Sequence, residues 1–527
     1  MLTETIADLT SSSTIAVTYT ITATITTIVL LIALHINNIR RSTSKGPLPP
    51  GPKPRYLIGN ALEIPFLNAS RRYLEWATEF GSSLVYLEAL GNKILILNSY
   101  EDAEELLESR TRIYCDRPVV HTLDMLGWDY NFALYPYGEQ WRAHRRVSHQ
   151  ALKPEATHKY HPIQLKKVHN MMLGLLDTPE RFWEHSKMLS ISLPLTTMYG
   201  YEVQSLDDPA VLAADKGAEI GQRIFAPGGS LVNVFPVLKH VPWTWTQRLA
   251  KESRRLAAEM KRIPLEGLLK DMANGTATPS MVGEFMERKQ TVGASEEEER
   301  LVINVANTVY GAAAGTTMSA INSTLYLLVT HPHVQLFAQA EIDRVFGTPR
   351  LPTFDDRGSL PYVEAIYREV MRLYPPLPLA LPHKTVEDDW YKGYFIPKGT
   401  NVSGNIWAMN RDVKRYPEPD TFKPERFINI DGSLNKDDKI TAYGFGRRGC
   451  IGKHVASDML WLTTATLLAC FSARKKRDSQ GNEIDVDHGY KEEGFVLLKA
   501  PIECDITPRS EVWKALVEGT KDEGYAY

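Results

Sequence analysis

The fold of this chain is decided by the run YGFGRRGCIG, which occupies residues 443–452. Apolar residues recur at three- and four-residue spacing after it, from Ala456 to Phe471, and this spacing predicts an amphipathic helix. Cys450 would then lie just ahead of a helix N-terminus. Backbone amides and the helix dipole there are expected to lower the pKa of the thiol and to favour the thiolate, the form that binds metals.

The glycines of this run also spell GxGxxG, a pattern typical of dinucleotide-binding loops. The preceding residues 437–441 are too polar for a buried strand, and no second strand ending in an acid follows the predicted helix. The glycines therefore fit better as a loop that brings backbone close to a flat cofactor.

A long helix is predicted to begin at Ser295, because Ser295 and Glu298 have the spacing of a capping box. Its apolar stripe leads to Gly311, Gly315 and Thr316. Glycines inside a helix cost about 1 kcal/mol each relative to alanine. They indicate either a tight helix crossing or a widened helix that admits a small ligand beside the Thr316 hydroxyl, and the segment alone favours the crossing.

A further helix is predicted over residues 362–374, where Glu369 and Arg372 are spaced to form an ion pair. Such pairs are common, so this one is weak evidence by itself. An apolar extended stretch, residues 377–381, then precedes His383. Its side chains either line a cavity or fill the core.

The N-terminal region has no charged residue from Leu9 to Ile39, and residues 14–36 are long enough to cross a bilayer as a helix. Alternating threonines would suggest a strand in water, but a lone strand cannot satisfy its backbone in lipid. A cleaved secretory signal is the alternative. Acidic residues before the run and the missing cleavage site count against it. The basic residues Arg40, Arg41 and Lys45 place the rest of the chain in the cytosol.

Composition excludes several other classes of protein. With 60 basic and 63 acidic residues, the 527-residue chain has a formal net charge of −3, and nothing in it indicates a nucleic-acid partner. Its four cysteines include no CxxC pair and its histidines no HExxH motif, so neither a disulfide framework nor a zinc site is expected. The proline-rich run from residue 46 to 54 forbids a regular helix and is either a stiff spacer or an exposed loop.

These segments together resemble the cytochrome P450 superfamily, from the proline-rich run to about Cys504. The haem-loop signature F-G-x-G-x-R-x-C-x-G is matched by residues 443–452, with Tyr443 in place of the usual Phe. The resemblance implies that Cys450 is the axial thiolate of haem b and that Arg448 pairs with a propionate. The other loop residues that it assigns to cofactor binding are Tyr443, Gly446 and Gly452.

Four weaker motifs occur in the order of the family, and together they are strong evidence. Trp141 and Arg145 match W-x-x-x-R, whose side chains lie against the haem propionates, and His383 stands where members often hold His or Arg for the same purpose. E-x-x-R together with P-E-R-F at residues 424–427 implies a structural triad of Glu369, Arg372 and Arg426.

One position departs from the family pattern. Members usually carry an acid immediately before the oxygen-side threonine, and here Gly315 precedes Thr316 and Thr317. The resemblance implies that these three residues form the catalytic region, but its acid–alcohol pair for proton relay is incomplete. Water or a substrate hydroxyl is the candidate replacement.

The fold implied by the resemblance is mainly α with small β-sheets, one globular domain behind an N-terminal transmembrane helix. The expected divisions are a membrane anchor at 1–40, a basic and proline-rich hinge at 41–55 and a catalytic domain at 56–527. The expected location is the endoplasmic reticulum membrane, crossed once, with the catalytic domain in the cytosol. Membrane lipid is thus an expected partner.

The implied activity is a haem-thiolate monooxygenase that hydroxylates or otherwise oxidises a hydrophobic small molecule, as fungal enzymes of secondary metabolism do. The thiolate pushes electron density onto iron and favours O–O cleavage. Electrons would come from NADPH through a separate cytochrome reductase, docked on a basic face of Arg142, Arg146, Arg447 and Lys453. Substrate would lie against residues 123–132, residues 377–381, Val305, Val309 and Ala312.

Two other classes remain open. A haem-thiolate isomerase or dehydratase would rearrange an oxygenated substrate without a reductase, and Gly315 in the acid position keeps this class in view. A membrane-anchored haem sensor without catalysis is the other. Consumption of NADPH with a reductase separates the monooxygenase from both.

Overall fold

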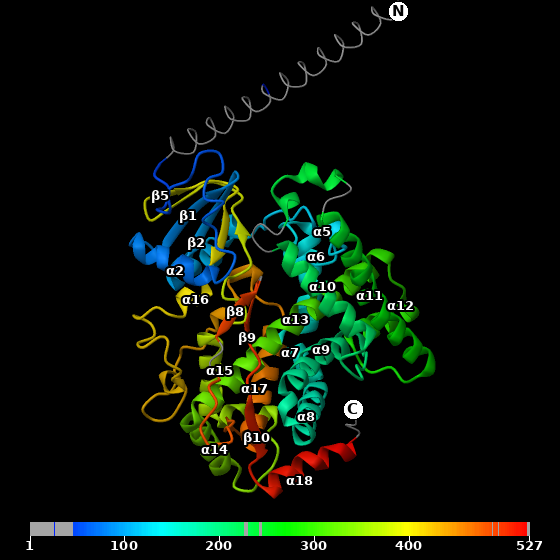
Figure 1. Cartoon of the computed structure of the whole chain (residues 1–527). Helices are drawn as coiled ribbons and strands as arrows, with labels where there is room; N and C mark the ends of the chain where they lie inside the picture. The colour runs from blue at the N-terminus through cyan, green and yellow to red at the C-terminus, as the bar shows by residue number, and fades with distance from the viewer. Residues whose placement is uncertain are drawn as a thin grey trace, which may run out of the picture.

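The structure is a computed structural model that describes Thr26 and residues 46–225, 230–241, 245–486, 489–493 and 495–523. Helices make up most of it, and small sheets gather mainly at one end (Figure 1). The expected membrane anchor lies outside the described residues apart from Thr26. Within the described part, no helix is both long enough and apolar enough to span a membrane.

The longest described helix, α13 (Glu296–Thr330), runs through the middle of the helical region (Figure 1). Its predicted start is confirmed, because the Ser295 side chain accepts from the Glu298 amide while the Glu298 carboxylate accepts from the Ser295 amide. It packs against α9 (Phe182–Tyr199), α6 (Glu139–Leu152) and α17 (Lys453–Cys470). Large apolar clusters on both sides of α13 bury its two ends.

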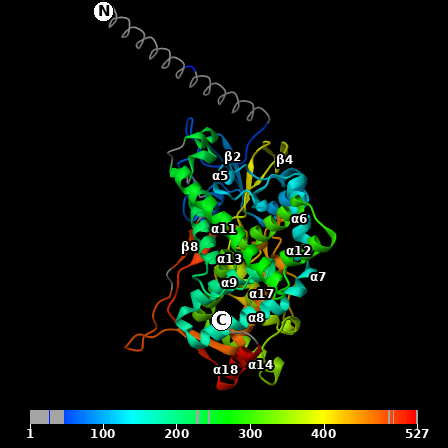
Figure 2. The same cartoon turned by 90° about the vertical axis from the view of Figure 1, so that its right-hand side faces the viewer.

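The remaining helices surround this centre (Figure 2). The helix predicted over residues 362–374 is confirmed as α15 (Pro361–Leu373). The other long helices are α2 (Ala69–Glu79), α8 (His161–Asp177), α10 (Pro209–Phe225), α11 (Trp245–Asn274), α12 (Met281–Val292), α14 (Pro332–Phe346) and α18 (Glu511–Gly519). One-turn helices are α3 (Tyr100–Ala103), α4 (Thr111–Tyr114), α5 (Leu123–Leu126), α7 (Pro154–Thr157) and α16 (Ile406–Met409).

The main sheet has the strand order β1-β2-β6-β3, in which β2 and β6 are parallel and the other pairs antiparallel. Its strands are β1 (Leu84–Ala89), β2 (Asn92–Leu97), β6 (Asn401–Gly404) and β3 (His383–Lys384). Antiparallel pairs elsewhere are β4 (Asp389–Tyr391) with β5 (Tyr394–Ile396), β7 (Phe471–Lys475) with β10 (Cys504–Pro508), and β8 (Tyr490–Glu493) with β9 (Val496–Lys499).

The proline-rich run is bonded to two of these strands. The Pro47 carbonyl accepts from the Phe395 amide and the Pro50 carbonyl from the Tyr86 amide, both at 2.8 Å. At Gly51 a Cβ would lie 1.9 Å from the Tyr86 carbonyl oxygen, so no side chain fits there. The described part of the predicted hinge is therefore attached to the sheets.

Candidate functional site

The cysteine loop, residues 443–452, is shaped by one obligatory glycine and by hydrogen bonds to itself. Gly446 has φ +55° and approaches the backbone so closely that a Cβ would lie 2.2 Å from the Leu107 carbonyl oxygen. The Cys450 amide donates to the Tyr443 carbonyl at 2.8 Å, which closes the loop. Gly452 has open space around it and serves as the N-cap of α17. The loop thus holds Cys450 immediately ahead of α17.

Cys450 differs from the other cysteines in its exposure. All four are free thiols; Cys115 and Cys470 are buried, Cys504 is partly buried and Cys450 is exposed. Burial nevertheless raises the pKa of the Cys450 thiol, and the Gly452 amide, Arg145 and Lys453 only partly oppose that rise. Because the Cys450 side chain is accessible and yet surrounded by protein atoms, it faces a hollow inside the protein.

This pKa corrects one expectation from the sequence. The helix N-terminus was expected to lower the pKa of the Cys450 thiol, but desolvation outweighs the helix and the nearby cations, and the net shift is upward. The protein alone therefore does not favour the thiolate. A metal cation bonded to the sulfur would, since a coordinated thiol loses its proton.

The middle of α13 is accessible although its flanks are buried. Gly311 and Ala312 are exposed and residues 313–316 are partly exposed, whereas Tyr310 and Thr317 on either side are buried. A hollow therefore runs beside this stretch of the helix. Ala314 there and Ile451 next to Cys450 pack against the same apolar cluster, and α13 contacts α17, the helix that follows the cysteine loop.

The two glycines of α13 do not serve a tight crossing. A Cβ would lie 3.9 Å from the nearest atoms at both Gly311 and Gly315, which is ordinary contact distance. Every residue of α13 is in regular α-helical conformation, so the helix is not widened at these glycines. Neither the tight crossing nor the widened helix predicted from the sequence therefore matches the geometry. The Thr316 hydroxyl lies in the accessible stretch and donates to the Ala312 carbonyl at 2.9 Å, whereas Thr317 is outside that stretch.

Three basic side chains lie at the cysteine loop, Arg117 buried and Arg145 and Arg448 partly buried, and we call them the arginine cluster. Arg448 donates to the carbonyls of Cys115 and Tyr135, and its Nη1 is buried without a partner in the described structure. Its guanidinium carbon is 4.3 Å from the centre of the Trp141 ring. Burial lowers the pKa of Arg448 to about 10.

Arg117 belongs to this cluster and was not found from the sequence. It is 5% exposed and donates to the carbonyls of Ala133, Leu381 and Pro382. Burial lowers its pKa to about 9. No motif marks this residue, because its partners are backbone carbonyls far away in the sequence.

His383 and Arg145 complete the surroundings. Nδ1 of His383 donates to the Tyr114 carbonyl at 2.8 Å, and burial, followed by Arg117 and Arg448, holds the pKa of the imidazole well below its usual range. The guanidinium of Arg145, on α6 four residues after Trp141, makes no hydrogen bond or ion pair within the described ranges. It is close enough to Cys450 to lower the pKa of that thiol.

The described residues do not balance the charges of the arginine cluster. Burial is the largest influence on the pKa of all three guanidinium groups, and Asp116 is the acid that acts on Arg117 and Arg448. Buried charges need ionic partners or complete hydrogen bonding. Three cations against one carboxylate leave two positive charges, which a flat cofactor with two carboxylates would neutralise beside an accessible thiol.

A second group of buried arginines has its carboxylate partner within the chain. It consists of Glu369, Arg372 and Arg426, and we call it the carboxylate cluster. Glu369 is 0% exposed and accepts from Arg372 Nε at 2.6 Å and from Arg426 Nε at 3.0 Å. It also accepts from the Lys423 amide at 2.9 Å. The structure thus brings together the three residues of the implied triad.

Comparisons with known proteins agree with this geometry. A family model described as Cytochrome P450 matches residues 49–505. Cytochrome P450 monooxygenase 98 of Postia placenta is 36% identical over 493 residues, which cover 91% of this chain and 94% of that protein. Cytochrome P450 monooxygenase COX2 of Coprinopsis cinerea is 36% identical over 488 residues, 90% of this chain and 91% of that protein. Tryptamine 4-monooxygenase of Psilocybe cyanescens is 32% identical over 503 residues, which cover 92% of this chain and 98% of that protein.

Proposed function

The chain belongs to the cytochrome P450 family, and from that premise we propose that it hydroxylates or otherwise oxidises a hydrophobic small molecule beside the middle of α13. Members of the family are oxidoreductases that incorporate oxygen and bind haem b through a cysteine thiolate. Haem supplies the activation of dioxygen when it is bound. The chain's own residues hold the cofactor, exclude water and deliver protons.

Cys450 is the proposed iron ligand, and the arginine cluster with Trp141 and His383 is the proposed propionate site. The observation that carries this assignment is the pair of uncompensated positive charges beside the one exposed thiol. Arg448 Nη1 offers a donor that no acceptor among the described residues uses. Haem therefore matches both the sulfur and the charge of the site.

The substrate is proposed to lie against apolar side chains that remain partly exposed. Val309 and Ala312 on α13 and leucines of residues 377–381 meet this condition, whereas Val305 is fully buried and belongs to the core. Apolar walls of this kind hold a lipophilic molecule. The hydroxyl of Thr316 is the proposed proton donor, and a water beside Gly315 would stand in for the missing acid. A place in secondary metabolism is part of this proposal.

The route of electrons and the membrane location are also proposals. Arg142, Arg146, Arg447 and Lys453 are exposed, so a reductase with an acidic surface could reach them. Arg142 and Arg146 both pair with the exposed Glu139, and such pairs give way easily to another partner. Residues 1–40 would anchor residues 56–527 to the cytosolic side of the endoplasmic reticulum through the hinge at 41–55.

One observation keeps a second function in view. Gly315 provides no acid for the proton relay, and an isomerase or dehydratase acting on an already oxygenated substrate would need none. NADPH distinguishes the two, because only the monooxygenase consumes it together with a reductase.

The test uses the full chain, a cytochrome reductase and NADPH, with lipophilic metabolites screened by spectral shift and product formation. Cys450→Ala is expected to abolish the red-shifted band of the reduced carbon monoxide complex, which is typical of thiolate-bound haem, and all NADPH-dependent product. Cys504→Ala is the matched control and is expected to keep both. A band that survives in Cys450→Ala would refute the ligand, and turnover without NADPH would favour the isomerase.

A further inference from the structure

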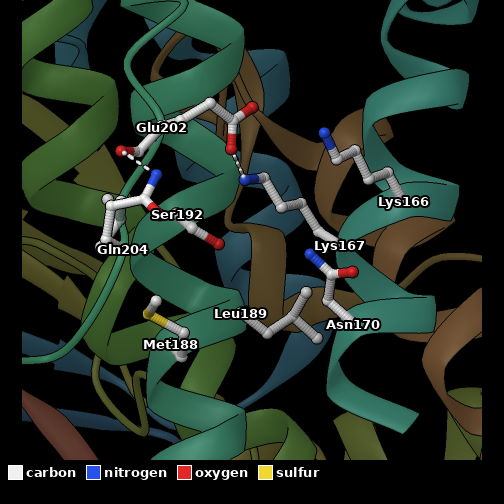
Figure 3. A pocket seen from close by; sticks show the side chains of 9 residues that line it. Lys166, Lys167, Asn170, Met188, Leu189, Ser192, Glu202 and Gln204 are labelled. Atoms are coloured by element: carbon white, nitrogen blue, oxygen red, sulfur yellow. Dashed lines mark hydrogen bonds and ion pairs between the residues drawn. The ribbon is translucent and has the colours of Figure 1, made fainter. Parts of the chain in front are cut away.

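A pocket of about 110 Å³ lies between α8 and α9, closed by the segment after α9 (Figure 3). Its polar lining comes from Lys166, Lys167, Ser192 and Glu202 and from the amides of Asn170 and Gln204, and its apolar side from Met188, Leu189 and Val203. None of its described lining residues belongs to the cysteine loop, the arginine cluster or α13. The pocket is therefore separate from the proposed haem site.

The central cation of this pocket is only partly satisfied. Lys167 is 4% exposed, and its ammonium pairs with one carboxylate oxygen of Glu202. An ammonium group has three N–H donors, and no second acceptor for Lys167 occurs among the described residues. Burial lowers the pKa of Lys167 while Glu202 opposes that shift. A further acceptor in the pocket would therefore stabilise the charged form.

Two other side chains around the space supply further donors. Lys166 has no ion pair in the part of the chain that the structure describes, and its side chain extends from α8 next to Lys167 (Figure 3). Ser192 is 3% exposed, makes no hydrogen bond to another described residue, and points its hydroxyl from α9 into the space. The carboxylate of Glu202 is already engaged by Lys167.

Charge counting gives the sign of the ligand. Two lysines and one carboxylate leave one positive charge on the pocket wall, with unused N–H and O–H donors on two helices. A water molecule takes up about 30 Å³ of liquid, so the space holds a few waters or one tetrahedral anion. Charge-assisted hydrogen bonds to an oxyanion are stronger than those to water.

We propose that this pocket binds a small oxyanion such as inorganic phosphate, held by Lys166, Lys167 and Ser192. The anion links α8 to α9, and α9 packs along α13, so its binding stabilises the helical core. Phosphate, sulfate and a carboxylate share the recognised chemistry. A ligand that binds only the folded state raises its melting temperature by mass action.

The experiment compares phosphate, sulfate, acetate and chloride at matched ionic strength on the haem-loaded full chain. Phosphate or another oxyanion is expected to raise the melting temperature by about 1–2 °C at saturation, and chloride is expected to leave it unchanged. Broadening of the phosphorus resonance of inorganic phosphate gives a second, independent readout. The reduced carbon monoxide band monitors the haem site, so failure here leaves the proposed function standing.

Variants distinguish the pocket from general salt effects. Lys166→Met is expected to abolish the oxyanion shift and Ser192→Ala to reduce it, whereas Lys153→Met, the same change at an exposed site outside the pocket, is expected to retain it. Equal stabilisation by chloride, or an equal loss in Lys153→Met, would overturn the proposal. No shift with any ion would also overturn it, because the pocket would then contain water only.

Discussion

The carboxylate cluster and the arginine cluster are both built on buried guanidinium groups, but their negative charge comes from different sources. Glu369 is fully buried and accepts from both Arg372 and Arg426, whose other N–H groups donate to backbone carbonyls of the chain. Among the described residues, Asp116 is the one carboxylate that acts on Arg117 and Arg448, and Arg448 keeps an unpartnered buried Nη1. The carboxylate cluster acquires its anionic partner when the chain folds. The arginine cluster acquires enough negative charge only when a dicarboxylate ligand binds.

Removing the internal carboxylate is expected to have the largest effect. Glu369→Gln leaves two buried arginines without a counter-ion, and breaking a buried pair in this way costs about 3–5 kcal/mol. Denaturant unfolding should show this loss in the haem-loaded and the haem-free protein alike. Glu418→Gln removes an exposed carboxylate near Lys423 and should cost no more than about 0.5 kcal/mol. Equal losses in the two variants would mean that Glu369 is not the central anion.

The arginine cluster should respond in the opposite way. Arg448→Met removes a charge-assisted hydrogen bond to the cofactor, about 1.5–3 kcal/mol, so haem should be released roughly tenfold to a hundredfold faster. The haem-free protein should lose less stability than with Glu369→Gln, because the change leaves two carbonyls, and no buried charge, without a partner. Transfer of haem to an apo-acceptor protein measures the release rate. The exposed neighbour Arg447→Met should retain haem; if it did not, general surface charge would explain the effect.

Structural features that depend on residues close together in the sequence were predicted correctly. The capping box of α13 and the helix α15 follow from residues three or four apart, and both are present. Cys450 was singled out by its glycine-rich loop, and the approach of Gly446 to Leu107 gives the physical reason for one of those glycines. Local spacing therefore predicted the helices and the loop.

Determinants distant in the sequence were not predictable in the same way. Arg117 bonds to the carbonyls of Leu381 and Pro382, 264 and 265 residues away, and no spacing rule covers such contacts. The parallel pairing of Ile94 with Asn401 is equally remote. The pKa of Cys450 was misjudged for a related reason, since desolvation depends on packing that spacing does not reveal.

The pH dependence of the haem-free protein sharpens the comparison. Burial beside Arg117 and Arg448 keeps His383 neutral, with a pKa well below its unfolded value of about 6.5. As the pH falls below that value, the unfolded chain binds a proton that the folded chain does not, so stability is lost by up to about 1.4 kcal/mol per pH unit.

His383→Gln should remove this loss, so urea unfolding of the two haem-free proteins should diverge below about pH 6.5 and agree above it. Haem should reduce the divergence, because its carboxylates offset the neighbouring arginines. The exposed His240→Gln serves as the control. Parallel curves for wild type and His383→Gln at every pH would show that His383 does not sense the cluster.

The smallest effect is expected where the cysteine loop contacts α15. The hydroxyls of Tyr443, in the cysteine loop, and Tyr367, on α15, are 2.9 Å apart. Tyr443→Phe removes this hydrogen bond, which is worth about 0.5–1.5 kcal/mol, while Tyr367 retains its contact with Ser457. No charge loses its partner in either cluster, so haem release should stay at the wild-type rate. Denaturant unfolding should show the small loss of stability. Release as fast as in Arg448→Met would mean that this phenol pair, and not charge, holds the cofactor loop in place.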